Sequence, residues 1–304
     1  MPDQPTPLPP GGTNAIGRML GLLGDEWNLL ILQQALMGAH RYTHFAARLP
    51  ISNSVLSKRL RTLVGEGLLT ADYLTTARSR SLWPLLLSIW EWERTWVSDH
   101  SGLLPAMRHD QCGERFSPVL RCAHCRRPVP GVDAVAVHPG PSGGWHRSAP
   151  VAVTRRRSDP AGPGRRAGLF PETMSVLGNR WAAALLVAAV LGTARFTDFQ
   201  SQLGVPPSLL AQRLQTFCEI GVLETGTDGV YLLTDKGKAF FGVLVTALQW
   251  AQRWFRAPEG PALRLTHRDC GAHFVPELAC DRCGRRLTGA AVEIVSSAAA
   301  VGNP

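Results

Sequence analysis

The sequence lacks a run of about 18 apolar residues, the length that a membrane-spanning helix requires. Its first twelve residues are rich in proline and lack both the basic start and the apolar stretch of a secretory signal. It also lacks a Ser/His/Asp arrangement, a phosphate-binding loop and a paired-carboxylate site. We therefore expect a cytoplasmic protein that is not an enzyme and contacts no membrane.

Cysteine is scarce outside two short motifs, which contain six of the seven cysteines. Both motifs follow the pattern H-x2-C-x9-C-x2-C: His109, Cys112, Cys122 and Cys125, and His267, Cys270, Cys280 and Cys283. In a reducing compartment this spacing favours metal binding over disulfides, and zinc prefers tetrahedral thiolate and imidazole ligands. We predict two structural Zn²⁺ sites, one from each set. Reduced cysteines packed as small apolar residues, and a thiol-based redox switch, stay open as alternatives.

The duplication extends upstream of these motifs. Nine residues recur at one constant offset: Trp27, Gly38, Arg41, Phe45, Leu49, Arg59, Leu60, Gly67 and Leu69 match Trp181, Gly192, Arg195, Phe199, Leu203, Arg213, Leu214, Gly221 and Leu223. A chain of 304 residues has room for two cores. The predicted divisions are a first domain over 13–107 with a Cys/His tail over 108–138, a linker over 139–168, and a second domain over 169–264 with a tail over 265–297.

Apolar periodicity predicts the same helices in both halves. The first helix is expected over 16–37 and 173–190, a short second helix over 41–49 and 196–203, and a third over about 53–66 and 208–220. Ser52 or Asn53 is expected to cap the third helix of the first half, and Gly67 to end it.

A strand pair should follow each third helix. Residues 222–226 and 230–233 flank Asp228 and Gly229, which predicts a hairpin wing in the second half. The first half is four residues shorter there, so its wing should be clipped. Long aromatic helices over 82–97 and 238–255 come next, and Pro84 should kink the first. Their tryptophans are expected to pack in a core or to join the halves, or two chains.

The predicted linker is rich in Gly, Pro, Ser and Arg. It carries one acid, Asp159, against these arginines: Arg155, Arg156, Arg157, Arg165 and Arg166. The composition is typical of a flexible basic spacer, which either keeps the chain soluble or follows phosphates.

The segment ISNSVLSKRLRTL at 51–63, followed by GLL at 67–69, resembles the core of HxlR-type winged helix-turn-helix transcriptional regulators, relatives of the MarR group. LLGDEW at 22–27 is similar to that family's opening motif, whereas VLGNRW at 176–181 and LAQRL at 210–214 match it less closely. The resemblance implies a mainly α fold with small β-wings. We expect two tandem winged helix-turn-helix domains, each followed by a small zinc-knuckle tail.

Winged helices place the third helix in the major groove, while the wing and helix ends hold phosphates. In the first half the predicted DNA contacts are Ser52, Asn53, Ser54, Ser57, Lys58, Arg59, Arg61, Arg78 and Arg80. In the second half they are Ser208, Gln212, Arg213, Gln215, Lys236 and Lys238. For Arg59 and Arg213, pairing with an acid inside the domain is an equal alternative. The first half has the more basic face, so we expect it to contribute more of the affinity.

Such regulators usually carry one winged domain and act as homodimers, whereas this chain carries two. We therefore predict a transcriptional regulator that reads double-stranded DNA through two recognition helices in one chain, with structural zinc. A net charge of +9 agrees with a polyanionic partner. The halves are expected to pair within the chain or as a homodimer, and a small-molecule effector is compatible with the class. The alternative is a metal- or redox-responsive protein-interaction scaffold built on winged helices.

Overall fold

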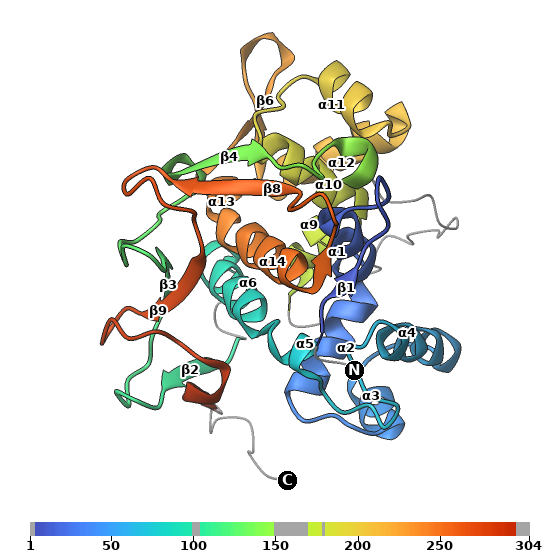
Figure 1. The fold of residues 1–304 in the computed structure, drawn as a ribbon, viewed down its shortest axis with the longest axis vertical. Helices are drawn as coiled ribbons and strands as arrows, with labels where there is room; N and C mark the ends of the chain where they lie inside the picture. Colours follow the sequence, from blue (N-terminus) through green and yellow to red (C-terminus); the bar gives the residue numbers. More distant parts are fainter. Residues whose placement is uncertain (1–3, 99–103, 149–169, 178–179, 296–304) are drawn as a thin grey trace.

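The computed structural model describes residues 4–98, 104–148, 170–177 and 180–295 (Figure 1). The five linker arginines named above lie outside these residues. The helices and strands of the first half are β1 (Thr6–Pro7), α1 (Ala15–Leu23), α2 (Glu26–Leu36), α3 (Tyr42–Arg48), α4 (Asn53–Gly65), α5 (Ala77–Arg80), α6 (Trp83–Trp96), β2 (Ala106–His109), β3 (Pro118–Cys122), β4 (Val135–Pro139) and α8 (Trp145–Ser148).

The second half repeats the order of six helices followed by three tail strands, and it adds a strand pair in its wing. Its helices and strands are α9 (Pro171–Leu177), α10 (Arg180–Val190), α11 (Phe196–Leu203), α12 (Pro207–Glu219), β5 (Leu223–Thr225), β6 (Tyr231–Leu233), α13 (Asp235–Ala239), α14 (Phe241–Trp254), β7 (Phe255–Arg256), β8 (Leu263–His267), β9 (Pro276–Cys280) and β10 (Val292–Val295). None of the described helices combines the length and the apolar character needed to cross a bilayer.

The single first helix predicted over 16–37 is wrong, because the chain breaks into α1 and α2 at Gly24 and Asp25. The Asp25 carboxylate accepts a hydrogen bond from the backbone N–H of Asn28 and so caps a new helix. Apolar periodicity continues across the break, which explains why the pattern predicted one helix.

The helix-turn-helix of the first half forms as expected, with α3 leading into α4. Leu56, Leu60 and Leu63 are fully buried on the inner face of α4. Ser52 occupies the N-cap position, although its side chain makes no capping bond. Gly67 adopts a left-handed φ of 67° just after the helix, where glycine is the least strained residue.

The predicted wings are confirmed. In the second half β5 pairs antiparallel with β6, and Asp228 and Gly229 both have positive φ in the connecting turn. In the first half the same region forms only an isolated bridge between Leu69 and Thr75. The shorter sequence of the first half therefore gives a wing too short for a strand pair.

The two halves pair through α6 and α14, which lie side by side at the centre of the molecule (Figure 1). The indole Nε1 of Trp92 donates to the Lys236 carbonyl at 3.0 Å, and that of Trp250 donates to the Arg78 carbonyl at 3.0 Å. These four residues occupy corresponding positions of the two repeats, so the bonds are related by an approximate two-fold axis. The tryptophans thus form a core and also join the halves within one chain.

The predicted kink at Pro84 is wrong. The helix α6 begins at Trp83, and Pro84 lies in its first turn. Proline is tolerated there because the N–H groups of the first turn have no acceptor inside the helix.

Trp250→Phe should lower the free energy of unfolding by about 1–3 kcal/mol, since a buried indole would be truncated and the Arg78 carbonyl would keep only the Ser81 hydroxyl as a donor. The matched change Trp96→Phe affects an indole that is 37% exposed and should cost less than about 0.5 kcal/mol. Urea unfolding followed by circular dichroism compares the two variants. Equal losses would contradict the assigned role of the Trp250 bond.

The strands of the two tails pair with each other rather than within their own half. β2 pairs with β10, β3 with β9, and β4 with β8, all antiparallel. An ion pair between Arg121 and Glu277, at 2.6 Å, joins β3 to β9. The tails are therefore interlocked, which determines where their metal-ligating side chains meet.

The beginning of the predicted linker is folded against the first half. Asn14, fully buried at the start of α1, donates from Nδ2 to the Ser142 carbonyl and to Ser148 Oγ. Arg147 is buried as well and donates to the Gly12 carbonyl. The expectation of a flexible spacer from residue 139 onward is therefore wrong for residues 139–148.

Candidate metal centres and nucleic-acid interface

Two clusters of one histidine and three cysteines lie in the interlocked tails. The first contains His109, Cys112, Cys280 and Cys283. The second contains Cys122, Cys125, His267 and Cys270. In each cluster the four ligand atoms lie within 4.8 Å of one another, so each cluster could hold a metal ion.

The grouping of these residues differs from the prediction. Each cluster takes the H-x2-C pair of one repeat and the C-x2-C pair of the other, whereas the spacing suggested one complete set per repeat. The reason is the strand between the pairs. At about 3.3 Å per residue, β3 separates its two ends by about 13 Å, and its antiparallel register places Cys122 opposite Pro276 and Pro118 opposite Cys280.

Histidine Nδ1 atoms point into both clusters. In the first, Nδ1 of His109 lies 3.5 Å from Cys112 Sγ and 3.4 Å from Cys283 Sγ. In the second, Nδ1 of His267 lies 3.3 Å from both Cys125 Sγ and Cys270 Sγ. Both imidazoles are fully buried. The Nδ1 atom would therefore be the histidine ligand of a metal ion bound in each cluster.

Phenylalanines pack against both imidazoles. Phe116 lies beside His109, and Phe274 lies beside His267, each with ring centroids 6.0 Å apart. These two phenylalanines belong to the nine-residue spacers of the motifs. The spacers thus supply both the strands that exchange between the tails and the apolar contacts beside the clusters.

The cysteines of each cluster differ in acidity. The backbone N–H of Arg127 lowers the pKa of Cys125 to about 6. Burial raises the pKa of Cys280 to about 11. A bound cation would favour the thiolate form of all six cysteines, because metal coordination deprotonates thiols.

The outer face of α4 is open to solvent. Ser54, Lys58 and Arg61 are exposed, and Ser57 is half-buried. Ser52 and Asn53 are exposed at the start of the helix, where the Tyr42 hydroxyl donates to the Asn53 side chain. The predicted residues therefore share one accessible surface, which we call the first reading face, defined by Ser52, Asn53, Ser54, Ser57, Lys58 and Arg61.

The outer face of α12 is equally accessible. Ser208, Gln212 and Gln215 are exposed and form the second reading face. The amide of Gln215 donates to Glu219 at 2.8 Å. This face therefore presents hydroxyl and amide groups in place of cations.

Two of the predicted phosphate contacts lie where the halves meet and contact aromatic rings of the other half. Arg78 is 4% exposed, donates to the Glu66 carbonyl and stacks over the ring of Trp254. Lys236 pairs with Glu172 at 2.5 Å and lies over the ring of Trp92. These cations occupy corresponding positions on either side of the approximate two-fold axis, where Arg78 is buried and Lys236 is half-buried.

The neighbouring cations of the two repeats remain accessible. Arg80 is exposed and donates to the Thr75 carbonyl. Lys238 is exposed, with Nζ 4.0 Å from the Asp235 carboxylate.

The two arginines at the edge of the apolar face have different surroundings. Arg59 forms an ion pair with Asp25 at 2.5 Å, as the alternative interpretation expected. Burial lowers the pKa of Arg213, whose Nε has no hydrogen-bond partner within the described part of the chain. The residue that corresponds to Asp25 is Asn179, which lies outside the described residues.

A basic cluster on α3 was missed in the sequence. Arg41 and Arg48 are exposed, and the rings of His40 and His44 meet edge to face at 4.9 Å. Burial, followed by the charges of these three neighbours, lowers the pKa of His44. In the second repeat the positions of His40, His44 and Arg48 carry uncharged or acidic residues: Ala194, Asp198 and Gln202. Comparing charge between the aligned repeats could have revealed this difference.

Comparisons with known proteins agree with this architecture. A family model described as HxlR-like helix-turn-helix matches residues 22–101 and 176–259, more than half of the chain. The uncharacterized HTH-type transcriptional regulator Rv3095 of Mycobacterium tuberculosis is 33% identical over 121 residues, covering 38% of this chain and 77% of that protein. The regulator YvaP of Bacillus subtilis, described in the same words, is 32% identical over 92 residues, covering 28% and 85%.

Two solved structures were also found. PA1607, provisionally described as a transcription factor, is 34% identical, with 36% of this chain and 82% of that chain covered and a TM-score of 0.33. PA1374 of Pseudomonas aeruginosa, described in the same way, is 26% identical, with 42% and 92% covered and a TM-score of 0.32. From the family match and the curated relatives, we conclude that the chain belongs to the HxlR-like helix-turn-helix family of transcriptional regulators and carries the family's domain twice.

Proposed function

We propose that this chain is a DNA-binding transcriptional regulator that presents two recognition helices, α4 and α12, to one duplex. The observation that carries the proposal is that both reading faces are exposed while the halves pair through other surfaces, α6 and α14. A helix can enter a major groove only if its outer face is uncovered. The pairing of the halves within one chain supplies the arrangement that single-domain relatives would need a second subunit to make.

The two reading faces would contribute unequally. The first presents Lys58 and Arg61, close to the basic cluster on α3. The second presents glutamines at the corresponding positions, Gln212 and Gln215. Phosphate neutralisation by cations supplies most of the salt-dependent affinity, whereas amides can form paired hydrogen bonds with adenine. The first face would thus provide affinity, and the second would add base contacts.

We further propose that both Cys/His clusters bind Zn²⁺ as structural sites. A tetrahedral zinc ion with Zn–S bonds of about 2.3 Å holds its sulfurs about 3.8 Å apart. The Sγ atoms of Cys112 and Cys280 lie 3.9 Å apart, which fits that geometry. Four protein ligands fill the coordination sphere, so the ions would hold the tails together rather than act on a substrate.

Salt titration tests the DNA-binding proposal. The intact chain should bind a 30-base-pair duplex of mixed sequence, and log K should fall linearly as log[KCl] rises. Fluorescence anisotropy between about 50 and 300 mM KCl measures that slope, which should be near −0.9 per phosphate neutralised. Affinity that is independent of salt, or no binding at the lowest salt, would refute recognition through phosphates.

A further inference from the structure

The duplication produces two corresponding cavities, one in each half, and they have diverged. The first-half cavity lies among α2, α6, β2 and β10 and has a volume of about 170 Å³. Its counterpart lies among α10, α14, α1 and β8 and has a volume of about 40 Å³. This difference in volume follows from a few substitutions between the repeats. Of these two cavities, the one in the first half is large enough for a ligand.

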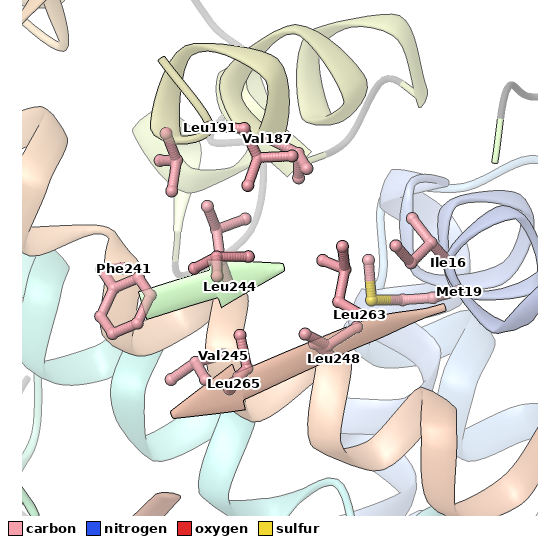
Figure 2. A pocket seen from close by; sticks show the side chains of 12 residues that line it. Ile16, Met19, Val187, Leu191, Phe241, Leu244, Val245, Leu248, Leu263 and Leu265 are labelled. Atoms are coloured by element: carbon pink, nitrogen blue, oxygen red, sulfur yellow. The ribbon is translucent and has the colours of Figure 1, made fainter. Parts of the chain in front are cut away.

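The smaller cavity is lined by apolar side chains, mostly aliphatic. Figure 2 shows Val187, Leu191 and Leu244 converging from α10 and α14, with Ile16 and Met19 beside them from α1. Its lining side chains carry no nitrogen or oxygen (Figure 2). A space of this size and chemistry is a packing defect and offers a ligand neither volume nor a hydrogen bond.

The larger cavity has a polar side chain where the smaller cavity has an aliphatic one. Gln33 stands where the second repeat has Val187, and it is only 7% exposed. Its Oε1 atom is buried and has no hydrogen-bond partner among the residues that the structure describes. Leaving a buried carbonyl oxygen unpaired costs about 1–3 kcal/mol, so a donor brought into the cavity would recover that energy.

Aromatic side chains complete the wall. Trp83 and Trp90 line the cavity where the second repeat has Phe241 and Leu248. The Nε1 of Trp90 donates to the Pro105 carbonyl, which fixes its indole. Flat aromatic surfaces favour stacked or edge-to-face contact with another ring.

The size and access of the cavity limit its occupant. An apolar cavity of about 150 Å³ holds one benzene molecule, and this one is similar in size. Met37 and Ile294 line it while remaining 46% and 42% exposed, so the cavity opens to solvent beside them. A single six-membered ring with one polar substituent fits this volume.

We propose that this cavity binds a small aromatic molecule of the phenol class, whose hydroxyl donates to Gln33 Oε1 while its ring packs against Trp83 and Trp90. The occupant would contact α2 of the first winged domain together with α6, one of the two helices through which the halves pair. It would also touch β10, which belongs to the second tail. The site thus joins three parts of the molecule.

Calorimetric titration of the intact chain with phenol and with toluene tests the proposal. The two probes have nearly the same shape, but only phenol carries a donor. We expect saturable phenol binding with a Kd of about 1 mM or below, and weaker toluene binding. The titration contains no DNA, so its result is independent of the proposed DNA reading.

Two glutamine variants locate the site. Gln33→Leu should weaken phenol binding roughly tenfold and leave toluene binding unchanged or tighter, since only the hydroxyl contact is lost. Gln34→Leu, on the same helix but outside the cavity lining, should leave both unchanged. Retained toluene binding by Gln33→Leu also shows that this variant is folded. Absence of saturable phenol binding up to about 10 mM, or equal phenol affinity in Gln33→Leu and the unaltered chain, would overturn the proposal.

Discussion

Cys112→Ser combined with Cys280→Ser is expected to leave one zinc ion per chain. Both cysteines belong to the same cluster, so the second substitution removes a ligand from a site that the first has already weakened. Serine is a poor zinc ligand, and structural zinc contributes about 10–16 kcal/mol of apparent binding energy at pH 7 through its full ligand set. The other cluster keeps its four ligands and should remain loaded.

Cys112→Ser combined with Cys122→Ser is the complementary double variant, because it affects both clusters instead of one. These cysteines lie in the same sequence motif but in different clusters, so each substitution disables a separate site. The expected content is close to zero zinc per chain. If each repeat instead formed its own site, the two double variants would exchange their results.

Elemental analysis after dialysis against a mild chelator provides the measurement. Cys218→Ser, which lies outside both clusters, is the control and should retain two zinc ions. Well under one zinc per chain in the unaltered protein would contradict structural zinc. One remaining zinc in the Cys112→Ser and Cys122→Ser double variant would contradict the crossed grouping.

Lys58→Ala combined with Arg61→Ala is expected to reduce DNA affinity by about 10- to 100-fold near 100 mM KCl and to lower the magnitude of the salt slope by about 2. Both side chains are exposed on the first reading face, so truncating them removes cations without opening the core. The 30-base-pair duplex and anisotropy assay described above provide the measurement.

Gln212→Ala combined with Gln215→Ala is the matched control on the second reading face. It removes uncharged groups from corresponding positions, so it should leave the salt slope unchanged and weaken binding less on a mixed-sequence duplex. Circular dichroism and zinc content should match the unaltered chain in both double variants. An unchanged affinity for Lys58→Ala with Arg61→Ala would mean that the first reading face has been misassigned.

Local features of the fold were predictable from the sequence. The helix-turn-helix of each half follows from apolar spacing, and the hairpin wing follows from Asp228 and Gly229. The division between α1 and α2 was not predictable from periodicity, because apolar residues continue through the break. The Asp25 cap decides it, and an acid just before a helix can be recognised only once a boundary is suspected.

Contacts between the two halves were the main feature that could not be predicted from the sequence. Arg78 and Lys236 look like surface cations because nothing near them in sequence marks them as buried. Their aromatic partners, Trp254 and Trp92, are supplied by the other half. The metal clusters follow the same pattern, since the eight ligands were predictable by type and spacing but their division between two sites depends on how β3 pairs with β9.

The exchange of strands between the tails has a consequence for biosynthesis. A ribosome releases the first H-x2-C and C-x2-C pairs long before their complements, Cys280 and Cys283 or His267 and Cys270, have been translated. Neither coordination shell could close until the ligands of the second repeat have emerged, up to Cys283 for one cluster and up to Cys270 for the other. A chain truncated after its first repeat would lack half of the ligands of each cluster, so metal loading would report that both repeats have been synthesised.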